Sequence, residues 1–85
     1  MNVEFDVSRT LDVTGHNCPI PVVKTKQEID DVESGGVLEV TATDQGSVSD
    51  IDGWASSTTG VKLLEQVEED DGGDTLYKHY VRKTE

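Results

Sequence analysis

Apolar and polar residues alternate along two stretches of the chain, and this alternation is typical of strands with one buried face. From Val3 to Val13 the apolar side chains keep one parity, and from Leu38 to Ala42 they do so again. We therefore predict a first strand that ends at Gly15 and a second strand over residues 38–42.

A helical spacing separates these two strands. The apolar stripe consists of Val22, Thr25, Ile29 and Val32. It is narrow, as expected for a helix that lies on a sheet. We predict a helix from about Pro19 to Val32, which the glycines at positions 35 and 36 stop.

A shorter helix should begin at Ser47, because the Ser47 hydroxyl and the Asp50 carboxylate can accept hydrogen bonds from the first N–H groups. Its buried face would consist of Val48, Ile51, Trp54 and Ala55. Residues 61–67 and 76–81 read as two further strands, joined by a solvated acidic turn over residues 68–74.

The predicted element order is β-α-β-α-β-β. A strand–helix–strand unit requires a crossover connection, whereas the last two strands can pair as an antiparallel hairpin. The fold class is therefore α+β: a two-layer α/β sandwich with a mixed four-stranded sheet and both helices on one face. We expect a single domain over residues 1–85.

The chain carries 18 acidic and 7 basic residues, a formal net charge of −11. This charge argues against direct nucleic-acid binding and against anionic membrane surfaces. No apolar run is long enough for a transmembrane helix, and the N-terminus lacks signal-peptide features. We expect a cytoplasmic monomer. Acid-rich, valine-rich and lysine-poor composition also favours a high-salt cytoplasm, although an ordinary acidic protein is the alternative.

The residues that could carry chemistry lie between Gly15 and Pro21, where a strand ends and a helix begins. Proline is tolerated in the first turn of a helix, so Pro19 and Pro21 mark the helix N-terminus. Cys18 then lies at or beside the N-cap, where the helix dipole and unpaired N–H groups favour a thiolate. The alternative is a small buried hydrophobic residue, which is the usual role of a free cysteine.

Elimination narrows the chemistry of Cys18. A single cysteine excludes both an intramolecular disulfide and a two-thiol redox cycle. His16 is poorly placed to act as its base, because nearby positions in an extended segment point apart, and His79 reads as a surface or sheet-face residue. One cysteine and two scattered histidines cannot form a zinc site, so we expect no metal and no cofactor. A lone thiolate is suited to accepting and donating a sulfur atom, or to reacting with an oxidant.

The segment Cys18-Pro19-Ile20-Pro21, which follows Gly15 and Leu11-Asp12, resembles the CPxP motif of the TusA/SirA-like sulfur-carrier family. The resemblance spans about residues 8–84, through Val22-Val23-Lys24-Thr25-Lys26, Asp44, Asp50-Ile51, Gly53-Trp54, Tyr77 and Val81-Arg82-Lys83. It implies the same β-α-β-α-β-β sandwich.

The resemblance also implies an activity. Cys18 would carry a persulfide that a cysteine desulfurase or rhodanese-type donor loads, and would pass the sulfur to a thiol of a downstream acceptor protein. Family members serve tRNA thiolation, molybdenum-cofactor synthesis or sulfur metabolism. Ile20 replaces the acidic residue of the best-studied tRNA-thiolation carriers, and Asn17 stands where a basic residue is frequent. Both differences leave the pathway open.

A docking surface can be proposed beside Cys18. Ile20 and Val23 lie off the inner stripe, and Lys24 and Lys26 add positive charge within two turns of the thiol. Asp44 follows the second strand. The alternatives are a solvated helix face for the lysines, a solvated turn carboxylate for Asp44, and either core or interface for Trp54.

Two other classes of function remain at this point. In the first, the chain is a non-enzymatic redox-sensing or regulatory interaction module, for which Cys18 is a sensor or is dispensable. In the second, a similar small fold binds RNA, which the acidic charge disfavours.

Overall fold

The computed structural model describes residues 7–17 and 20–85. Its elements are, in chain order, β1 (Arg9–Asp12), α1 (Ile20–Ile29), β2 (Val37–Ala42), α2 (Ser47–Ser57), β3 (Val61–Asp71) and β4 (Asp74–Lys83). The strands form one sheet in the order β1-β2-β4-β3. β1 runs parallel to β2, and the other two pairs are antiparallel.

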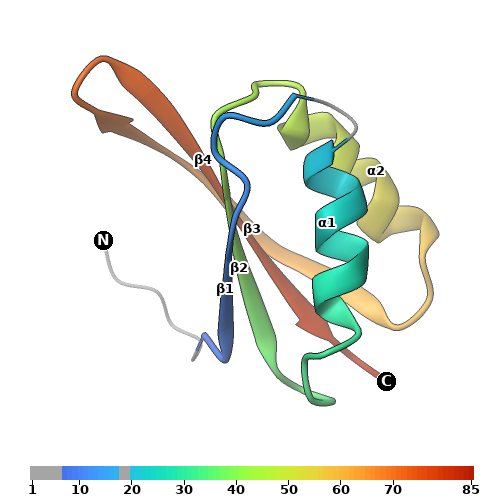
Figure 1. Cartoon of the computed structure of the whole chain (residues 1–85). Coiled ribbons are helices and arrows are strands. Elements are labelled where there is room, and N and C mark those ends of the chain that lie inside the picture. The colour runs from blue at the N-terminus through green and yellow to red at the C-terminus, as the bar shows by residue number, and fades with distance from the viewer. Residues whose placement is uncertain (1–6, 18–19) are drawn as a thin grey trace.

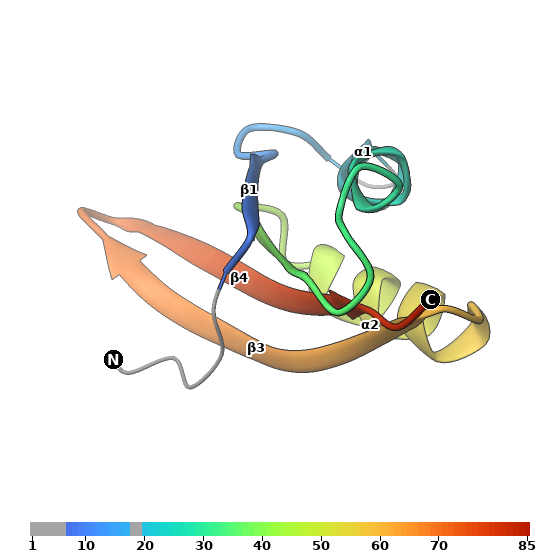
Figure 2. The same ribbon diagram turned by 90° about the horizontal axis from the view of Figure 1, so that it is seen from below.

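Both helices cover the same face of this sheet, as the two views in Figure 1 and Figure 2 show. The predicted α+β sandwich is therefore confirmed. None of the described helices is long and apolar enough to cross a membrane.

The core lies between the helices and the strands β2 and β4. Pairing between these strands places Leu38 opposite Val81 and Val40 opposite His79, so all four side chains share the helix-covered face. Thr25, Ile29 and Val32 are buried as predicted, and Val22 packs against their cluster. From α2 the core receives Ile51, Trp54 and Ala55, whereas Val48 is only half-buried.

β1 is an edge strand of four residues that pairs with β2 alone. The predicted strand is longer, but its residues 3–6 lie outside the described part of the chain. On the helix-covered face, Arg9 donates a hydrogen bond to the Glu28 carboxylate and so joins β1 to α1. The backbone pairing continues past the strand, because Val13 N donates to Thr41 O at 2.8 Å.

The hairpin of β3 and β4 is longer than predicted. The acidic residues 68–71 and 74 belong to the strands, and only Gly72 and Gly73 form the turn. Both glycines have positive φ, 63° and 110°, which suits a two-residue hairpin turn and favours glycine there. The interpretation of residues 68–74 as one solvated turn is therefore wrong, and Lys78 offsets part of the charge by pairing with Glu69 at 3.3 Å.

Candidate functional site at the carboxyl ends of β1 and β2

The predicted reactive residue, Cys18, lies outside the described residues, and so does Pro19. The described chain reaches this segment at Asn17 and continues from it at Ile20, the first residue of α1. Ile20 N donates a hydrogen bond to Asn17 O at 3.0 Å across the gap. The ends of the segment that contains Cys18 therefore lie close together, after β1 and directly before α1.

The loop after β1 turns sharply at Thr14 and Gly15. Asp12 Oδ1 accepts hydrogen bonds from the Thr14 hydroxyl at 2.7 Å and from Thr14 N at 2.9 Å. Both bonds favour the charged carboxylate and hold the pKa of Asp12 below its ordinary value, and the bond from the Thr14 hydroxyl has the larger effect. Gly15 has a φ of 82°, a conformation that glycine adopts without strain. β1 itself ends at Asp12, so Gly15 belongs to the turn after the strand and does not end it as predicted.

The loop between β2 and α2 lies beside this first loop, because parallel strands end at the same edge of the sheet. Gly15 N donates to Thr43 Oγ1 at 2.8 Å and so joins the two loops directly. In the second loop, Asp44 Oδ1 accepts from Gly46 N at 3.1 Å, and Asp44 O accepts from Ser47 N at 3.0 Å. Asp44 is therefore a structured part of the edge that also holds the Cys18 segment.

The first two turns of α1 present apolar side chains to solvent. Ile20 is 40% exposed and Val23 is 41% exposed. On the opposite side of the helix Pro21 is buried, and its carbonyl oxygen accepts a hydrogen bond of 2.7 Å from the Thr25 hydroxyl. Pro21 lies in the first turn of α1, as the sequence predicts.

The structure does not keep all the predicted docking residues together. Ile20 and Val23 lie at the end of α1 next to the Cys18 segment, and Asp44 lies on the neighbouring loop. Lys26 is in the last turn of α1 and lines a hollow whose wall includes Trp54. Trp54 itself is a core residue with 9% exposure.

Comparison with known proteins identifies the family. The model of the family described as sulfurtransferase TusA matches residues 9–83. The chain belongs to the TusA family.

Three relatives show how far the similarity to TusA-family proteins extends. A protein from Halobacterium salinarum is 61% identical over 84 residues, which cover 99% of each chain. The sulfur carrier protein TusA of Allochromatium vinosum is 45% identical over 64 residues, 75% of this chain and 83% of its own. The sulfur carrier protein TusA of Pseudomonas putida is 39% identical over 80 residues, 94% of each chain.

The crystal structure of a SirA-like protein from Desulfitobacterium hafniense has the same fold. Its TM-score is 0.65 at 29% identity, and the match covers 85% of this chain and 95% of that one. The resemblance drawn from the CPxP segment is therefore confirmed at the level of the TusA family. The Halobacterium relative also agrees with the high-salt composition.

A buried polar network supports the start of α2 in this TusA-family chain. His79 is fully buried and touches Ser47 Oγ through Nε2 at 3.0 Å. The Gln66 amide nitrogen lies 3.1 Å from His79 Nδ1 and donates to Val48 O at 2.8 Å. Because an amide nitrogen can only donate, Nδ1 accepts and Nε2 carries the proton. Burial lowers the pKa of His79 to about 4, so the ring is neutral near pH 7.

This network corrects two sequence predictions. The Ser47 side chain turns inward to His79, and α2 has Gly46 at its N-cap with no side-chain cap, so the predicted capping by Ser47 and Asp50 is wrong. His79 lies on a sheet face, as one of the two interpretations held, but it is not a surface residue. His79 stands two residues before Val81 in the last strand, so both side chains lie on the same face of the sheet. This alternation could have predicted that His79 is buried.

Within residues 7–17 and 20–85, no three histidine, cysteine, aspartate or glutamate side chains are arranged to hold a metal ion.

Proposed function

We propose that Cys18 accepts a sulfane sulfur as a persulfide and passes it to a thiol of an acceptor protein. The observation that carries this proposal is Cys18-Pro19-Ile20-Pro21 at the junction of β1 and α1, within a family match that covers residues 9–83. The sulfurtransferase family supplies the class of activity. The persulfide relay through this cysteine is the proposal.

The transfer needs no external oxidant. The Cys18 thiolate attacks the outer sulfur of a donor persulfide, a new S–S bond forms, and the donor leaves as its thiolate. In the second step an acceptor thiolate attacks the outer sulfur on Cys18, and the Cys18 thiolate leaves. One sulfur atom moves in each step, and the thiols regenerate at the same oxidation level.

The local charge supports a thiolate at position 18. Residues 13–27 contain no aspartate or glutamate, whereas Lys24 follows in the middle of α1. The nearest preceding carboxylate, Asp12, is engaged by Thr14. The N-terminus of α1, the positive end of the helix dipole, begins two residues after the cysteine at Ile20. All three features favour the thiolate form of Cys18, in a chain that is acidic as a whole.

The proposed docking surface consists of Ile20, Val23 and Asp44, which lie at the same edge as the Cys18 segment. Two exposed apolar side chains next to a reactive atom suit contact with a partner protein. The donor would be a cysteine desulfurase or a rhodanese-type protein, and the acceptor a protein thiol, in the cytoplasm where thiols stay reduced. Residues 1–85 would act as one domain in this relay.

The test incubates the chain with a cysteine desulfurase and cysteine, and then measures the mass of the intact protein. We expect one added sulfur atom on Cys18, removable by a reductant, and none on Cys18→Ser with an unchanged circular dichroism spectrum. If the protein donor adds no sulfur while peroxide oxidises the thiol, the proposal is wrong and the redox-sensing module is favoured.

A second variant tests the docking surface. Val23→Glu should keep its reaction with a small alkylating reagent but lose most of its sulfur transfer from the protein donor, since an unpaired charge is costly in an interface. Ser56→Glu, which adds the same charge to the exposed side of α2, is the matched control. Equal rates for Val23→Glu and Ser56→Glu would place the docking surface elsewhere.

A further inference from the structure

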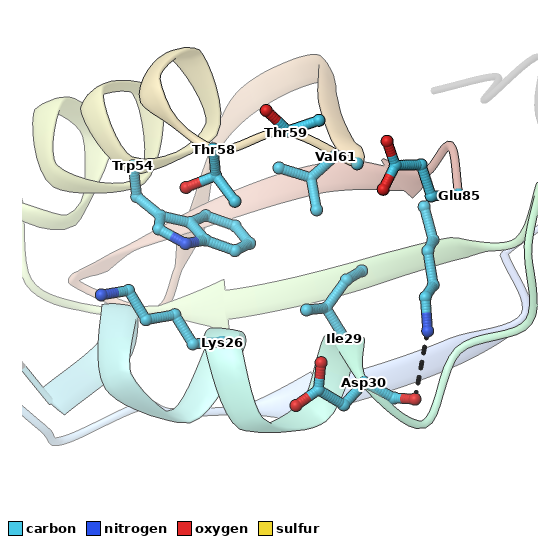
Figure 3. Close-up of a pocket in the computed structure, with 10 residues that line it drawn as sticks. Lys26, Ile29, Asp30, Trp54, Thr58, Thr59, Val61 and Glu85 are labelled. Carbon is cyan, nitrogen blue, oxygen red and sulfur yellow. Dashed lines mark hydrogen bonds between the residues drawn. The ribbon is translucent and has the colours of Figure 1, made fainter.

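A hollow of about 620 Å³ lies at the end of α1 that is far from the Cys18 segment. Its apolar wall consists of Ile29, Trp54 and Val61, and the hydroxyl-bearing residues Thr58 and Thr59 border it (Figure 3). Lys26 and Trp54 stand at one end and Glu85 at the other. An apolar wall of this kind, open to solvent and bordered by polar groups, is typical of a site that receives a side chain.

Two stretches of the chain that lack carboxylates contribute to this part of the surface. The two longest stretches without aspartate or glutamate are residues 13–27 and 53–64. The first includes the exposed side of α1, and the second supplies Trp54, Thr58, Thr59 and Val61 to the hollow. Stretches of 15 and 12 residues without a carboxylate stand out in a chain with 18 acidic residues. Depletion of carboxylates is expected where a surface is buried against a partner.

Two lysines, Lys26 and Lys83, and two carboxylates, Asp30 and Glu85, border the hollow. Among the described residues, Lys26 and Lys83 form no ion pair, since the ion pairs there join Arg9 to Glu28 and Asp31, and Lys78 to Glu69. Lys83 Nζ donates to the Asp30 carbonyl oxygen at 3.2 Å. In Figure 3 the Asp30 side chain lies below Ile29 in the middle of the hollow, and the Glu85 side chain lies at the end away from Trp54. The end near Lys26 is thus open to an acidic ligand.

We propose that this hollow anchors the partner protein. It would bind one large apolar side chain of the partner, and carboxylates would flank that side chain in the partner's sequence. The apolar side chain would lie against Trp54, Ile29 and Val61, and the flanking carboxylates would face Lys26. This inference rests on the proposed function, because it names how the sulfur donor holds the carrier. It adds a second contact point to the docking surface beside Cys18.

The two contact points are joined by α1. Ile20, Val23 and Lys26 follow one another at three-residue spacing, a row that winds partly around the helix, and Ile20 to Lys26 spans about 9 Å of helix axis at 1.5 Å per residue. A partner segment that reaches from Ile20 to the hollow therefore needs only a few residues. An anchor at this distance would hold the partner while leaving the Cys18 sulfur accessible.

Trp54 is the single tryptophan of the chain, so its fluorescence reports directly on the hollow. The probe is a synthetic hexapeptide with a central Leu-Phe pair between two acidic residues on each side. The comparison peptides replace Leu-Phe with Gly-Ser, or the acidic residues with lysines. We expect only the acidic Leu-Phe peptide to change the fluorescence in a saturable way at low salt.

Salt separates the two parts of the contact. In molar KCl the charge contribution is screened, whereas apolar contact is retained. The acidic Leu-Phe peptide should still bind, and the Gly-Ser peptide should not bind at either salt concentration. Equal binding of both acidic peptides, or no change in Trp54 fluorescence with any peptide, would overturn the proposal.

Matched variants locate the contact. Thr59→Glu and Lys26→Glu place a carboxylate at the hollow and should weaken peptide binding about tenfold, a factor worth about 1.4 kcal/mol. Thr84→Glu and Lys24→Glu add the same charges at exposed positions that do not line the hollow, and should change the affinity by less than about twofold. Equal weakening by all four variants would show a general charge effect and no anchor site.

The anchor and the relay can fail separately. The peptide should bind Cys18→Ser as well as the unmodified chain, because the thiol is not part of the hollow. Thr59→Glu should slow sulfur loading from the protein donor but not from inorganic polysulfide. Peptide binding without any loading of Cys18 would contradict only the proposed function, whereas normal protein-dependent loading in Thr59→Glu would contradict only the anchor.

Discussion

Acidification from pH 7 to pH 5 should destabilise the fold through one side chain, His79. Its Nδ1 accepts a hydrogen bond from the Gln66 amide, and its Nε2 donates to Ser47. Protonation would place a hydrogen on Nδ1, where it would face the N–H group of the Gln66 amide inside the core. The ring therefore resists protonation, and burial lowers the pKa of His79 from 6.5 to about 4.

The direction and size of the effect follow from these two pKa values. Between pH 6.5 and pH 4 the unfolded chain binds a proton that the folded chain excludes, so stability falls as the pH falls. Full protonation would cost about 3 kcal/mol, and about 2 kcal/mol is already lost at pH 5. For a domain of this size, 2 kcal/mol lowers the melting temperature by about 8–16 °C.

The assay compares the unmodified chain with His79→Gln by urea unfolding at pH 7, 6 and 5 in constant molar KCl. Glutamine can still donate to Ser47 and accept from Gln66, but it does not titrate. Above pH 5 most carboxylates remain ionised, so the difference between the two proteins isolates His79. We expect the unmodified chain to lose about 2 kcal/mol more than the variant between pH 7 and pH 5.

Parallel pH profiles for the two proteins would refute this reasoning. So would a His79 ring resonance that titrates near pH 6.5 in the folded protein, with His16→Gln used to assign the two histidines. Either result would mean that water or an anion reaches the ring and that the network around Ser47 is not closed.

Three further predictions concern other parts of the molecule. Burial and the hydrogen bond to Glu39 raise the pKa of Tyr80 to about 12. The fold should therefore lose stability above pH 10, because the phenol ionises in the unfolded chain but not in the folded one. Comparing the tyrosinate absorbance of the unmodified chain with that of Tyr80→Phe checks this prediction, and ionisation of Tyr80 near pH 10 in the folded state would contradict it. Thr43→Val removes the acceptor for Gly15 N and should lower the free energy of unfolding in urea by about 1 kcal/mol. Thr43→Ser keeps the hydroxyl and should retain most of that stability. Equal stability of the two variants would show that the two loops stay together without this hydrogen bond. Added KCl should raise the melting temperature, because salt screens repulsion in a chain of net charge −11; a flat or falling trend up to molar salt would remove the high-salt interpretation.

Local periodicity was sufficient for the elements and the fold class. The stripe of Thr25, Ile29 and Val32 is buried as its spacing predicts, and the alternation in β2 identifies Leu38, Val40 and Ala42 as core residues. These patterns succeed because each reports which side of an element faces the other layer.

Contacts between distant residues explain where the sequence reasoning fails. Ser47 has the spacing of a capping residue, but its hydroxyl finds His79 in the core, 32 positions away, and no local pattern encodes that partner. The acidic residues 68–71 form strand because they pair with residues 74–77 of β4, and Glu68, Asp70 and Asp71 stay exposed there. Lys26 lies near Cys18 in sequence, yet the length of α1 carries it to the hollow at Trp54.

The shortness of β1 has a consequence for how the carrier meets its partners. The Cys18 segment follows a strand of four residues that is bonded on one side only, whereas β4 has neighbours on both sides. Amide hydrogen exchange should therefore be fast in β1 and the loop after it, through local opening, and slow in β4, where exchange requires global unfolding. β1 is thus a short edge strand beside a longer hairpin of β3 and β4. Under the proposed relay Cys18 would meet a donor and then an acceptor, and local opening of β1 and of residues 13–17 would not require unfolding of the hairpin.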